Sequence, residues 1–244
     1  MTRGTMSRMF SFITRTWNPL GGRCPHSCVY CWSMGKRGLV NRYNMQKYQG
    51  GPWLIEKELN RRFKPGEFVF VQDMSDLWAR EVSSELIAKV LDVVEASPHA
   101  TFLFLTKNPE RYLEFVGQLP PNAVLGATVE TDRSYFEHER YGERLYEEIS
   151  QAPLPALRLH AMEKLKELRQ NRLFISIEPV LDFDLGIFID HLWRIHPWAV
   201  CVGYDNYGYR LPEPPLNKTM QLIEKLKAFT RVICKTIRLA WWEV

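Results

Sequence analysis

The chain has 244 residues, of which 45% are hydrophobic and 25% are charged, which fits one domain of ordinary globular composition. No apolar stretch approaches bilayer length, and the apolar run Phe10–Ile13 is followed by Arg15 rather than by a signal-peptide cleavage site. The odd number of cysteines, five, argues against a disulfide framework. We therefore expect a cytoplasmic protein without a membrane anchor.

The formal net charge of +4 hides an uneven distribution of charge along the chain. Residues 1–64 contain 12 Lys and Arg but only two Glu, which gives a net charge of +10. The remaining residues contain 20 Lys and Arg and 26 Asp and Glu, which gives a net charge of −6. Several aromatic residues share the basic segment: Trp17, Tyr30, Trp32, Tyr43, Tyr48 and Trp53. Cations interleaved with rings suit phosphates and bases, which predicts an anionic partner. A solvated basic surface that offsets the charge of a bound cofactor explains the same pattern.

Seven short apolar runs are predicted to be β-strands. In chain order they are Phe10–Thr16, Phe68–Val71, Thr101–Leu105, Ala123–Ala127, Leu173–Ile177, Trp198–Val202 and Arg231–Cys234. Most are continuously apolar rather than alternating, which is typical of parallel strands that are buried on both faces.

Helical patterns separate these strands. The predicted helices are Leu86–Val94 with Ser83 or Ser84 as N-cap, one with Asn108 as N-cap and Pro109 first in the helix, Tyr135–Ile149, Ala156–Arg169 and Met220–Phe229. We expect residues 131–171 to form a helical insertion. The alternation of strands and helices predicts one α/β domain over residues 1–244, a parallel sheet that is open or curled into a barrel.

A triplet of cysteines follows the first predicted strand. Cys24, Cys28 and Cys31 have the spacing C-x3-C-x2-C, and three thiolates leave a four-coordinate metal centre one ligand short. In a cubane iron–sulfur cluster the missing ligand is an open position on one iron. The alternatives are a zinc site with His26 as fourth ligand, a redox pair of Cys28 and Cys31, and three unrelated cysteines. The spacing and the β/α context favour the cluster.

Polar residues stand where the later strands end. They are Gln72-Asp73, Thr106-Lys107, Thr128 with Glu130, Glu178, Tyr204-Asp205-Asn206 and Lys235-Thr236. The carboxyl ends of parallel strands meet at one rim, so we expect a pocket for a polar ligand there. Cys201, inside a predicted strand, is a candidate hydrogen-atom donor facing the barrel interior. A buried small hydrophobic residue is the alternative for Cys201 and for Cys234.

The motif C-x3-C-x-aromatic-C, with Tyr30 as the aromatic residue ahead of repeated β/α units, resembles the radical S-adenosylmethionine (SAM) enzymes over nearly the whole chain. The implied fold is a partial (β/α)6-type TIM barrel. Three further motifs resemble a phage, bacterial and archaeal family that is distantly similar to the spore photoproduct lyase branch: Thr16-Trp17-Asn18-Pro19, Asp73-Met74-Ser75-Asp76 and Ser176-Ile177-Glu178-Pro179.

The resemblance implies cofactors and residue roles. Cys24, Cys28 and Cys31 would hold a 4Fe–4S cluster whose fourth iron binds SAM, and reductive cleavage of SAM would give a 5′-deoxyadenosyl radical that abstracts hydrogen from a substrate. The other cofactor-binding candidates are Tyr30 near adenine, Gln72, Asp73 and Ser75 in place of an absent Gly-Gly-Glu stretch, Thr128 and Glu130 for ribose, and Glu178 for adenine or substrate.

The implied partners are an electron donor of the flavodoxin or ferredoxin type and a substrate. The basic segment and the likeness to spore photoproduct lyase favour a nucleic acid or nucleotide substrate. A peptide or small metabolite is the alternative within the enzyme class. A non-catalytic protein that binds metal or nucleic acid is the alternative from another class.

Overall fold

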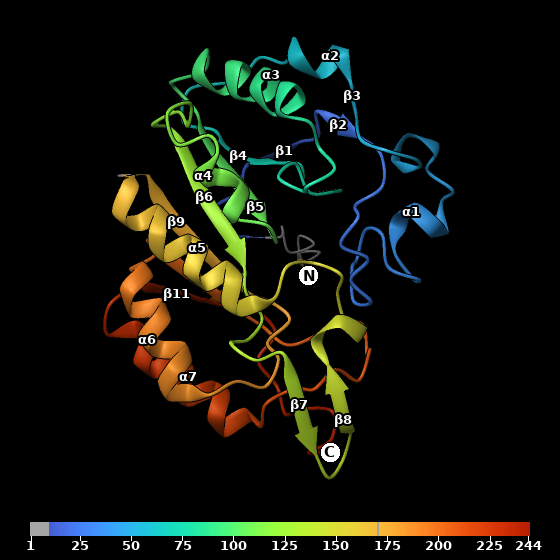
Figure 1. Ribbon diagram of the computed structural model, residues 1–244, viewed down its shortest axis with the longest axis vertical. Coiled ribbons are helices and arrows are strands. Elements are labelled where there is room, and N and C mark those ends of the chain that lie inside the picture. The colour runs from blue at the N-terminus through green and yellow to red at the C-terminus, as the bar shows by residue number, and fades with distance from the viewer. Residues whose placement is uncertain (1–9, 170) are drawn as a thin grey trace, which may run out of the picture.

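The computed structural model describes residues 10–169 and 171–244 and contains a seven-stranded parallel sheet (Figure 1). Its strand order is β1-β4-β5-β6-β9-β10-β11. The strands are β1 Arg15–Trp17, β4 Phe68–Val71, β5 Thr101–Thr106, β6 Ala123–Thr128, β9 Arg172–Ile177, β10 Ala199–Val202 and β11 Arg231–Cys234. This confirms the predicted α/β class, and the parallel sheet is consistent with a partial barrel.

The first strand starts later than predicted. Residues 10–13 form a turn, closed by the Ile13 amide donating to the Phe10 carbonyl at 3.0 Å. The Phe10 ring packs 6.0 Å from Phe70 on β4 and 4.9 Å from Phe174 on β9, measured between ring centroids. Two other strands separate β4 from β9, so these contacts require the sheet to curve around Phe10.

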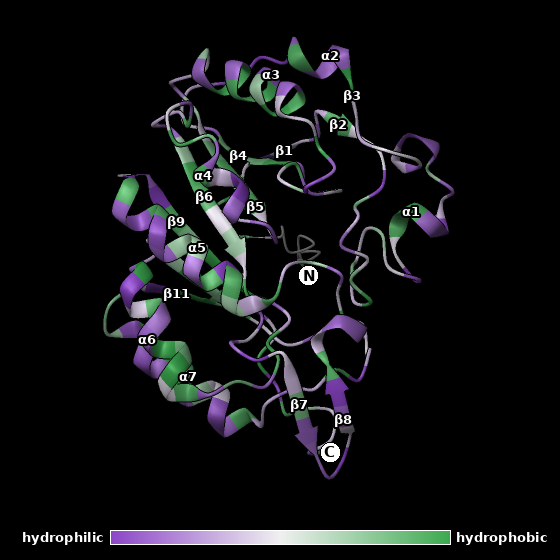
Figure 2. Cartoon of the chain, viewed as in Figure 1, coloured by the Kyte–Doolittle hydropathy of each residue, from purple (hydrophilic) through white to green (hydrophobic). Residues whose placement is uncertain are grey.

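The inner strands of the sheet are buried on both faces, as the continuous apolar runs predict, whereas the edge strands β1 and β11 are more exposed. Val69 and Val71 pack into the core under the helices, whereas Phe70 between them packs into a second core inside the curve of the sheet. The helices along the sheet are α3 Ser84–Glu95, α4 Glu110–Leu113, α5 Pro155–Leu168, α6 Leu185–Ile195 and α7 Leu216–Lys227. Of these, α3, α6 and α7 carry apolar and polar residues on different faces (Figure 2). Among the described residues, no helix combines the length and apolar character needed to cross a membrane.

The segment between β1 and β4 contains the cysteine loop. Its short elements are β2 Leu20–Gly21, α1 Leu39–Arg42, the 3-10 helix η1 Gln46–Tyr48, β3 Trp53–Leu54 and α2 Glu56–Leu59. β2 and β3 pair in antiparallel fashion. In Figure 1 most of this segment forms a blue lobe to one side of the strand ends.

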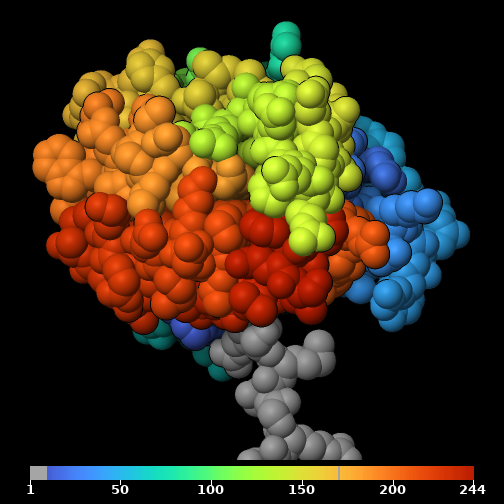
Figure 3. Space-filling view, turned by 90° about the horizontal axis from the view of Figure 1, so that it is seen from below, coloured from blue at the N-terminus to red at the C-terminus, as the bar shows by residue number. Residues whose placement is uncertain are grey.

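The helix predicted over Tyr135–Ile149 is wrong. This stretch forms an antiparallel hairpin of β7 Tyr135–His138 and β8 Gly142–Leu145, followed by the 3-10 helix η2 Tyr146–Glu148. Gly142 has a φ of 70° at the turn, a conformation that glycine adopts readily. The hairpin lies against the C-terminal segment, where the rings of His138 and Trp242 are 4.2 Å apart (Figure 3). The insertion therefore holds one hairpin and one long helix.

One helix start and one whole helix also differ from expectation. α4 begins at Glu110, and the Asn108 side chain donates to the Trp78 carbonyl at 3.0 Å instead of capping the helix. α6 was not predicted, although Asp184 caps it by accepting the Ile187 amide at 3.0 Å.

Candidate functional site

The cysteine loop and the carboxyl ends of the strands enclose a cavity of about 1130 Å³. Phe10, Phe70 and Leu105 contribute apolar walls. The cavity is slightly larger than the roughly 300–1,000 Å³ typical of small-molecule pockets. Its volume suits a cofactor together with part of a second ligand.

Most of the site residues proposed from the sequence line this cavity. They are Cys24, Cys28, Tyr30, Cys31, Gln72, Asp73, Ser75, Thr128 and Glu178. The parallel topology explains why residues more than 100 positions apart share one space, because every strand ends at the same rim. Glu130 and Cys201 are fully buried and do not line the cavity.

The three motif cysteines are held by a tight loop. Ser27 has a φ of 47°, a left-handed conformation, between Cys24 and Cys28. Cys28 Sγ lies 3.1 Å from Ser150 Oγ, and Cys31 Sγ accepts the Met34 amide at 3.2 Å. Burial raises the pKa of the Cys24 and Cys31 thiols, and backbone N–H groups act in the opposite direction. Amide donors of this kind stabilise a thiolate, the form that binds metal.

The donor set fits an iron–sulfur cluster. No group of three His, Cys, Asp or Glu within residues 10–169 and 171–244 has the arrangement needed to hold one metal ion. In a cubane each thiolate would bind a different iron, so the three ligands need not converge on one ion. Three cysteines that line one cavity supply a donor set of this kind.

Asp76 fastens the cysteine loop to the sheet. Its Oδ2 accepts from His26 Nε2 at 2.8 Å, Thr106 Oγ1 at 2.8 Å and the Lys107 amide at 2.9 Å. Its Oδ1 accepts the Trp78 amide at 2.9 Å. Burial acts to raise the pKa of Asp76, but these hydrogen bonds and the His26 ring outweigh it and hold the pKa below its usual value. The sequence motif contains Asp76, but sequence reasoning gave it no role.

Gln72 shapes the turn that follows β4. Its φ is 61°, and its side-chain amide accepts the Leu20 amide at 2.9 Å and donates to the Leu20 carbonyl at 3.1 Å. It also donates to Ser75 Oγ at 2.7 Å. Beside it, Asp73 accepts from the Asn18 side chain at 2.6 Å, and burial raises the pKa of Asp73. Gln72 thus uses both ends of its amide within the protein.

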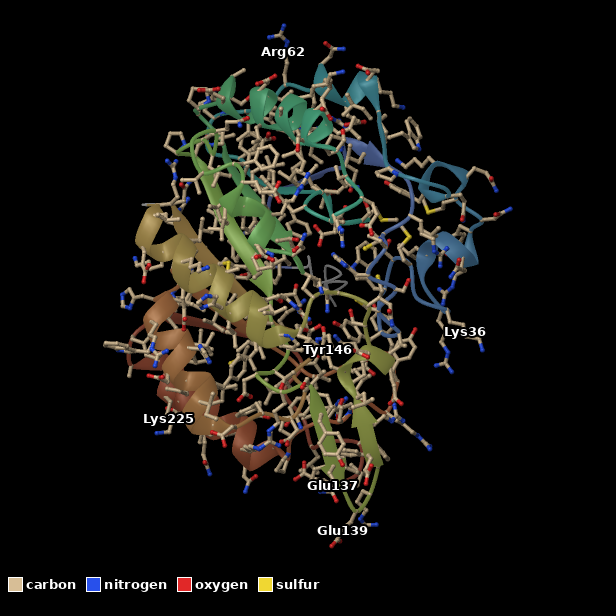
Figure 4. All side chains as sticks on the ribbon, viewed as in Figure 1. Lys36, Arg62, Glu137, Glu139, Tyr146 and Lys225 are labelled. Carbon is tan, nitrogen blue, oxygen red and sulfur yellow. The ribbon has the colours of Figure 1, made fainter. Side chains whose placement is uncertain are left out.

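Glu130 lies behind the cavity wall. It accepts hydrogen bonds from Lys107, Tyr30 and Tyr146, and from Arg158 Nη1 at 2.7 Å. Tyr146 lies between α5 and the cysteine loop (Figure 4). Burial acts to raise the pKa of Glu130, but Lys107 and Arg158 lower it to about 2.

Sequence reasoning missed Arg158 and Tyr146. An available signal was the inward position of Arg158 on α5, four residues before the buried Met162 and one before the buried Leu159. An arginine on the apolar face of a helix requires a buried partner. The sequence does not show that this partner is Glu130.

Glu178 and Lys235 form an ion pair on another part of the cavity wall. Lys235 Nζ is 3.0 Å from Glu178 Oε2. Gly203, at the end of the intervening strand β10, makes room for the pair. A Cβ there would lie 3.2 Å from Lys235 Cβ and 3.4 Å from Glu178 Oε1. Burial raises the pKa of Glu178, with Lys235 acting in the opposite direction.

Cys201 faces the interior of the curved sheet with Ala199 and Phe174. In the β9–β10 register it stands opposite Ser176, which does line the cavity. Burial raises the pKa of the Cys201 thiol. Cys234, at the end of β11, is exposed.

Solved structures share this fold. A spore photoproduct lyase mutant with bound AdoMet and dinucleoside spore photoproduct has a TM-score of 0.53 at 10% identity, with 88% of this chain and 61% of that chain covered. A second spore photoproduct lyase mutant has a TM-score of 0.56 at 11% identity, covering 88% and 75%. SuiB of Streptococcus suis bound to S-adenosylmethionine has a TM-score of 0.53 at 10% identity, covering 96% and 53%. This chain thus spans less than two thirds of the first of these proteins and about half of SuiB.

At these identities the likeness defines the fold, a partial barrel of the kind seen in those SAM-bound proteins. The sequence defines the family. Residues 8–141, more than half of the chain, match the family described as protein of unknown function (DUF5131), and the chain belongs to it. The comparison with curated proteins found no match.

Proposed function

We propose that this chain is a radical SAM enzyme that holds a 4Fe–4S cluster on Cys24, Cys28 and Cys31. One observation carries the proposal. The three motif cysteines and the polar ends of the strands line a single cavity, in a fold shared with two proteins solved with SAM bound. An open coordination position facing that cavity is where SAM would bind.

The chain's own residues have distinct tasks in this proposal. When bound, the cluster and SAM supply one-electron cleavage to a 5′-deoxyadenosyl radical, which is cofactor chemistry. Phe10, Phe70 and Leu105 form apolar walls that exclude water from a reactive species. Tyr30 and Thr128 face the cavity and would orient the nucleoside part of SAM. Glu130 bonds to Tyr30 from behind, so we now assign it to positioning rather than to ribose contact.

For the substrate we propose a nucleic acid or nucleotide. The first acidic residue of the chain is Glu56, so the cysteine loop contains no carboxylate of its own. Arg37 and Arg42 from this segment line the cavity, and phosphate groups bind such cations. A peptide or small metabolite is the alternative, and an electron donor of the flavodoxin or ferredoxin type is the proposed redox partner.

Anaerobic reconstitution with iron and sulfide tests the enzyme class. The loaded protein should be brown, and after chemical reduction it should convert SAM to methionine and 5′-deoxyadenosine, measured by liquid chromatography. Cys31→Ala should abolish cluster assembly and SAM cleavage while the circular dichroism spectrum stays unchanged. Cys234→Ala is the matched control, because this exposed cysteine lies outside the cavity-lining set.

Two results would contradict the proposal. Stoichiometric zinc with no binding of SAM would favour the non-catalytic alternative. SAM cleavage that survives Cys31→Ala would remove the cysteine triplet from the reaction.

A further inference from the structure

Two cations and one carboxylate form a buried ionic group next to the cysteine loop. The exposed fractions are 0% for Glu130, 1% for Arg158 and 9% for Lys107. Lys107 comes from the end of β5, Glu130 from the segment after β6 and Arg158 from α5. The group carries one excess positive charge, which is costly in a protein interior unless a negative charge lies nearby.

The hydrogen bonds of Lys107 show how its positive charge is held in place. An ammonium group has three N–H donors. Lys107 Nζ donates to Glu130 Oε1, to Tyr30 Oη and, at 3.3 Å, to Tyr146 Oη. Every donor therefore has a partner inside the protein. Lys107 lines the cavity. Because its N–H donors are all used within the protein, its ammonium acts as a fixed charge and not as a hydrogen-bond donor to a ligand.

Arg158 is held in the same way. Its Nε donates to the Pro153 carbonyl at 2.7 Å, and its Nη1 donates to the Thr128 carbonyl and to Glu130, each at 2.7 Å. Its Nη2 donates to Tyr146. These contacts fix both cations relative to the sheet, so their charge cannot move away from the cysteine loop.

The excess charge lies against the cysteine loop. Lys107 Nζ donates to Oη of Tyr30, which stands between Cys28 and Cys31 in the chain, and Lys107 lines the same cavity as the three cysteines. Asp76, the buried carboxylate that holds His26 of the loop, accepts the backbone amide of Lys107. A cluster on the three cysteines would therefore share the cavity with the fixed ammonium of Lys107.

We propose that Lys107 sets the reduction potential of the cluster through the positive charge that it holds beside the cysteine loop. This rests on the proposed function, because it requires the cluster. Reduction adds one negative charge, and a fixed cation nearby stabilises the reduced form more than the oxidised form. Lys107 is therefore a positioning residue that acts through its charge, with Glu130, Tyr30 and Tyr146 keeping it in place.

The test is the midpoint potential of the reconstituted protein, measured by spectroscopic redox titration without turnover. Lys107→Met should lower the equilibrium constant for reduction at least tenfold, a shift of about 59 mV to more negative potential for a one-electron couple. Lys107→Arg keeps the charge and should stay within threefold of the wild type. Lys107→Met leaves Glu130 paired with Arg158, so the fold should survive.

Glu130→Gln should shift the midpoint potential in the opposite direction. It removes a negative charge from the same group and should move the potential to more positive values, whereas looser packing or entry of water would move both variants in one direction. An unchanged potential in Lys107→Met, or equal shifts in Lys107→Met and Lys107→Arg, would overturn the inference. If Glu130→Gln does not fold, the comparison of the two Lys107 variants decides. A wild-type protein that assembles no cluster would instead overturn the proposed function.

Discussion

Asp76 connects three segments that are distant in the sequence. Through its two oxygens it holds His26 of the cysteine loop, the Trp78 amide after β4, and Thr106 and the Lys107 amide at the end of β5. A carboxylate accepts at both oxygens and donates at neither. The site therefore has four donors that only an ionised Asp can satisfy together.

Asp76→Asn should destabilise the protein by about 2 kcal/mol or more, because its NH2 group would replace an acceptor that buried donors require. The loss should appear in urea unfolding at neutral pH. Because the pKa of Asp76 is lowered in the folded state, its stabilisation is present above its ordinary pKa of about 3.9. This stabilisation is lost as the pH falls through the lowered pKa that Asp76 has in the folded protein.

The variant and the wild type should therefore converge in acid. Asp92→Asn, on the exposed side of α3, is the control and should change stability by less than about 0.5 kcal/mol. Equal effects of the two substitutions would show that Asp76 does not hold the loop.

The space inside the curve of the sheet is so tightly packed that one strand, β6, has no room for a side chain at Gly126. Gly126 lies in β6, and a Cβ at this position would lie 2.8 Å from the Phe104 carbonyl oxygen and 3.3 Å from Phe174 Cδ1. A backbone oxygen in a strand cannot yield as a side-chain end can. The packing inside the curved sheet thus requires a residue without a side chain at position 126.

Gly126→Ala should destabilise the protein by about 1–3 kcal/mol, the usual cost of overpacking a core. Gly117→Ala is the matched control, because a Cβ there meets nothing within 4 Å, and it should be neutral within about 0.5 kcal/mol. Chemical denaturation of both variants measures the difference. A stability for Gly126→Ala equal to that of Gly117→Ala would show that β6 shifts to accept the methyl group.

The strands could be predicted from the sequence because burial on both faces leaves a continuous apolar run such as Phe68–Val71. The hairpin could not, because Phe136 is the one buried residue of its two strands, so neither strand shows an apolar–polar alternation. Cys24, Cys28 and Cys31 were identifiable because three cysteines within eight positions form a motif that the sequence itself displays. Arg158 was not, because its partner Glu130 is fixed only by the packing of α5 on the sheet.

Part of the basic segment lies on the opposite side of the molecule from the helix α7. Lys36, in the basic segment beside α1, and Lys225 on α7 lie on opposite sides of the molecule (Figure 4). Among the described residues, Lys36 and Arg42 have no carboxylate within ion-pair distance. A polyanion attracted to this side would approach the mouth of the cavity, which Arg42 lines.

A nucleic acid substrate should therefore bind more weakly when these two cations are neutralised. For a single-stranded oligonucleotide, the slope of log K against log salt falls by about 0.7 for each phosphate that the protein no longer neutralises. Lys36→Gln combined with Arg42→Gln should lower the slope by up to about 1.4, measured by fluorescence anisotropy. Lys164→Gln combined with Lys225→Gln removes the same charge from the helical side and should leave the slope unchanged. Equal decreases in both double variants would mean that net charge, rather than this face, attracts the oligonucleotide.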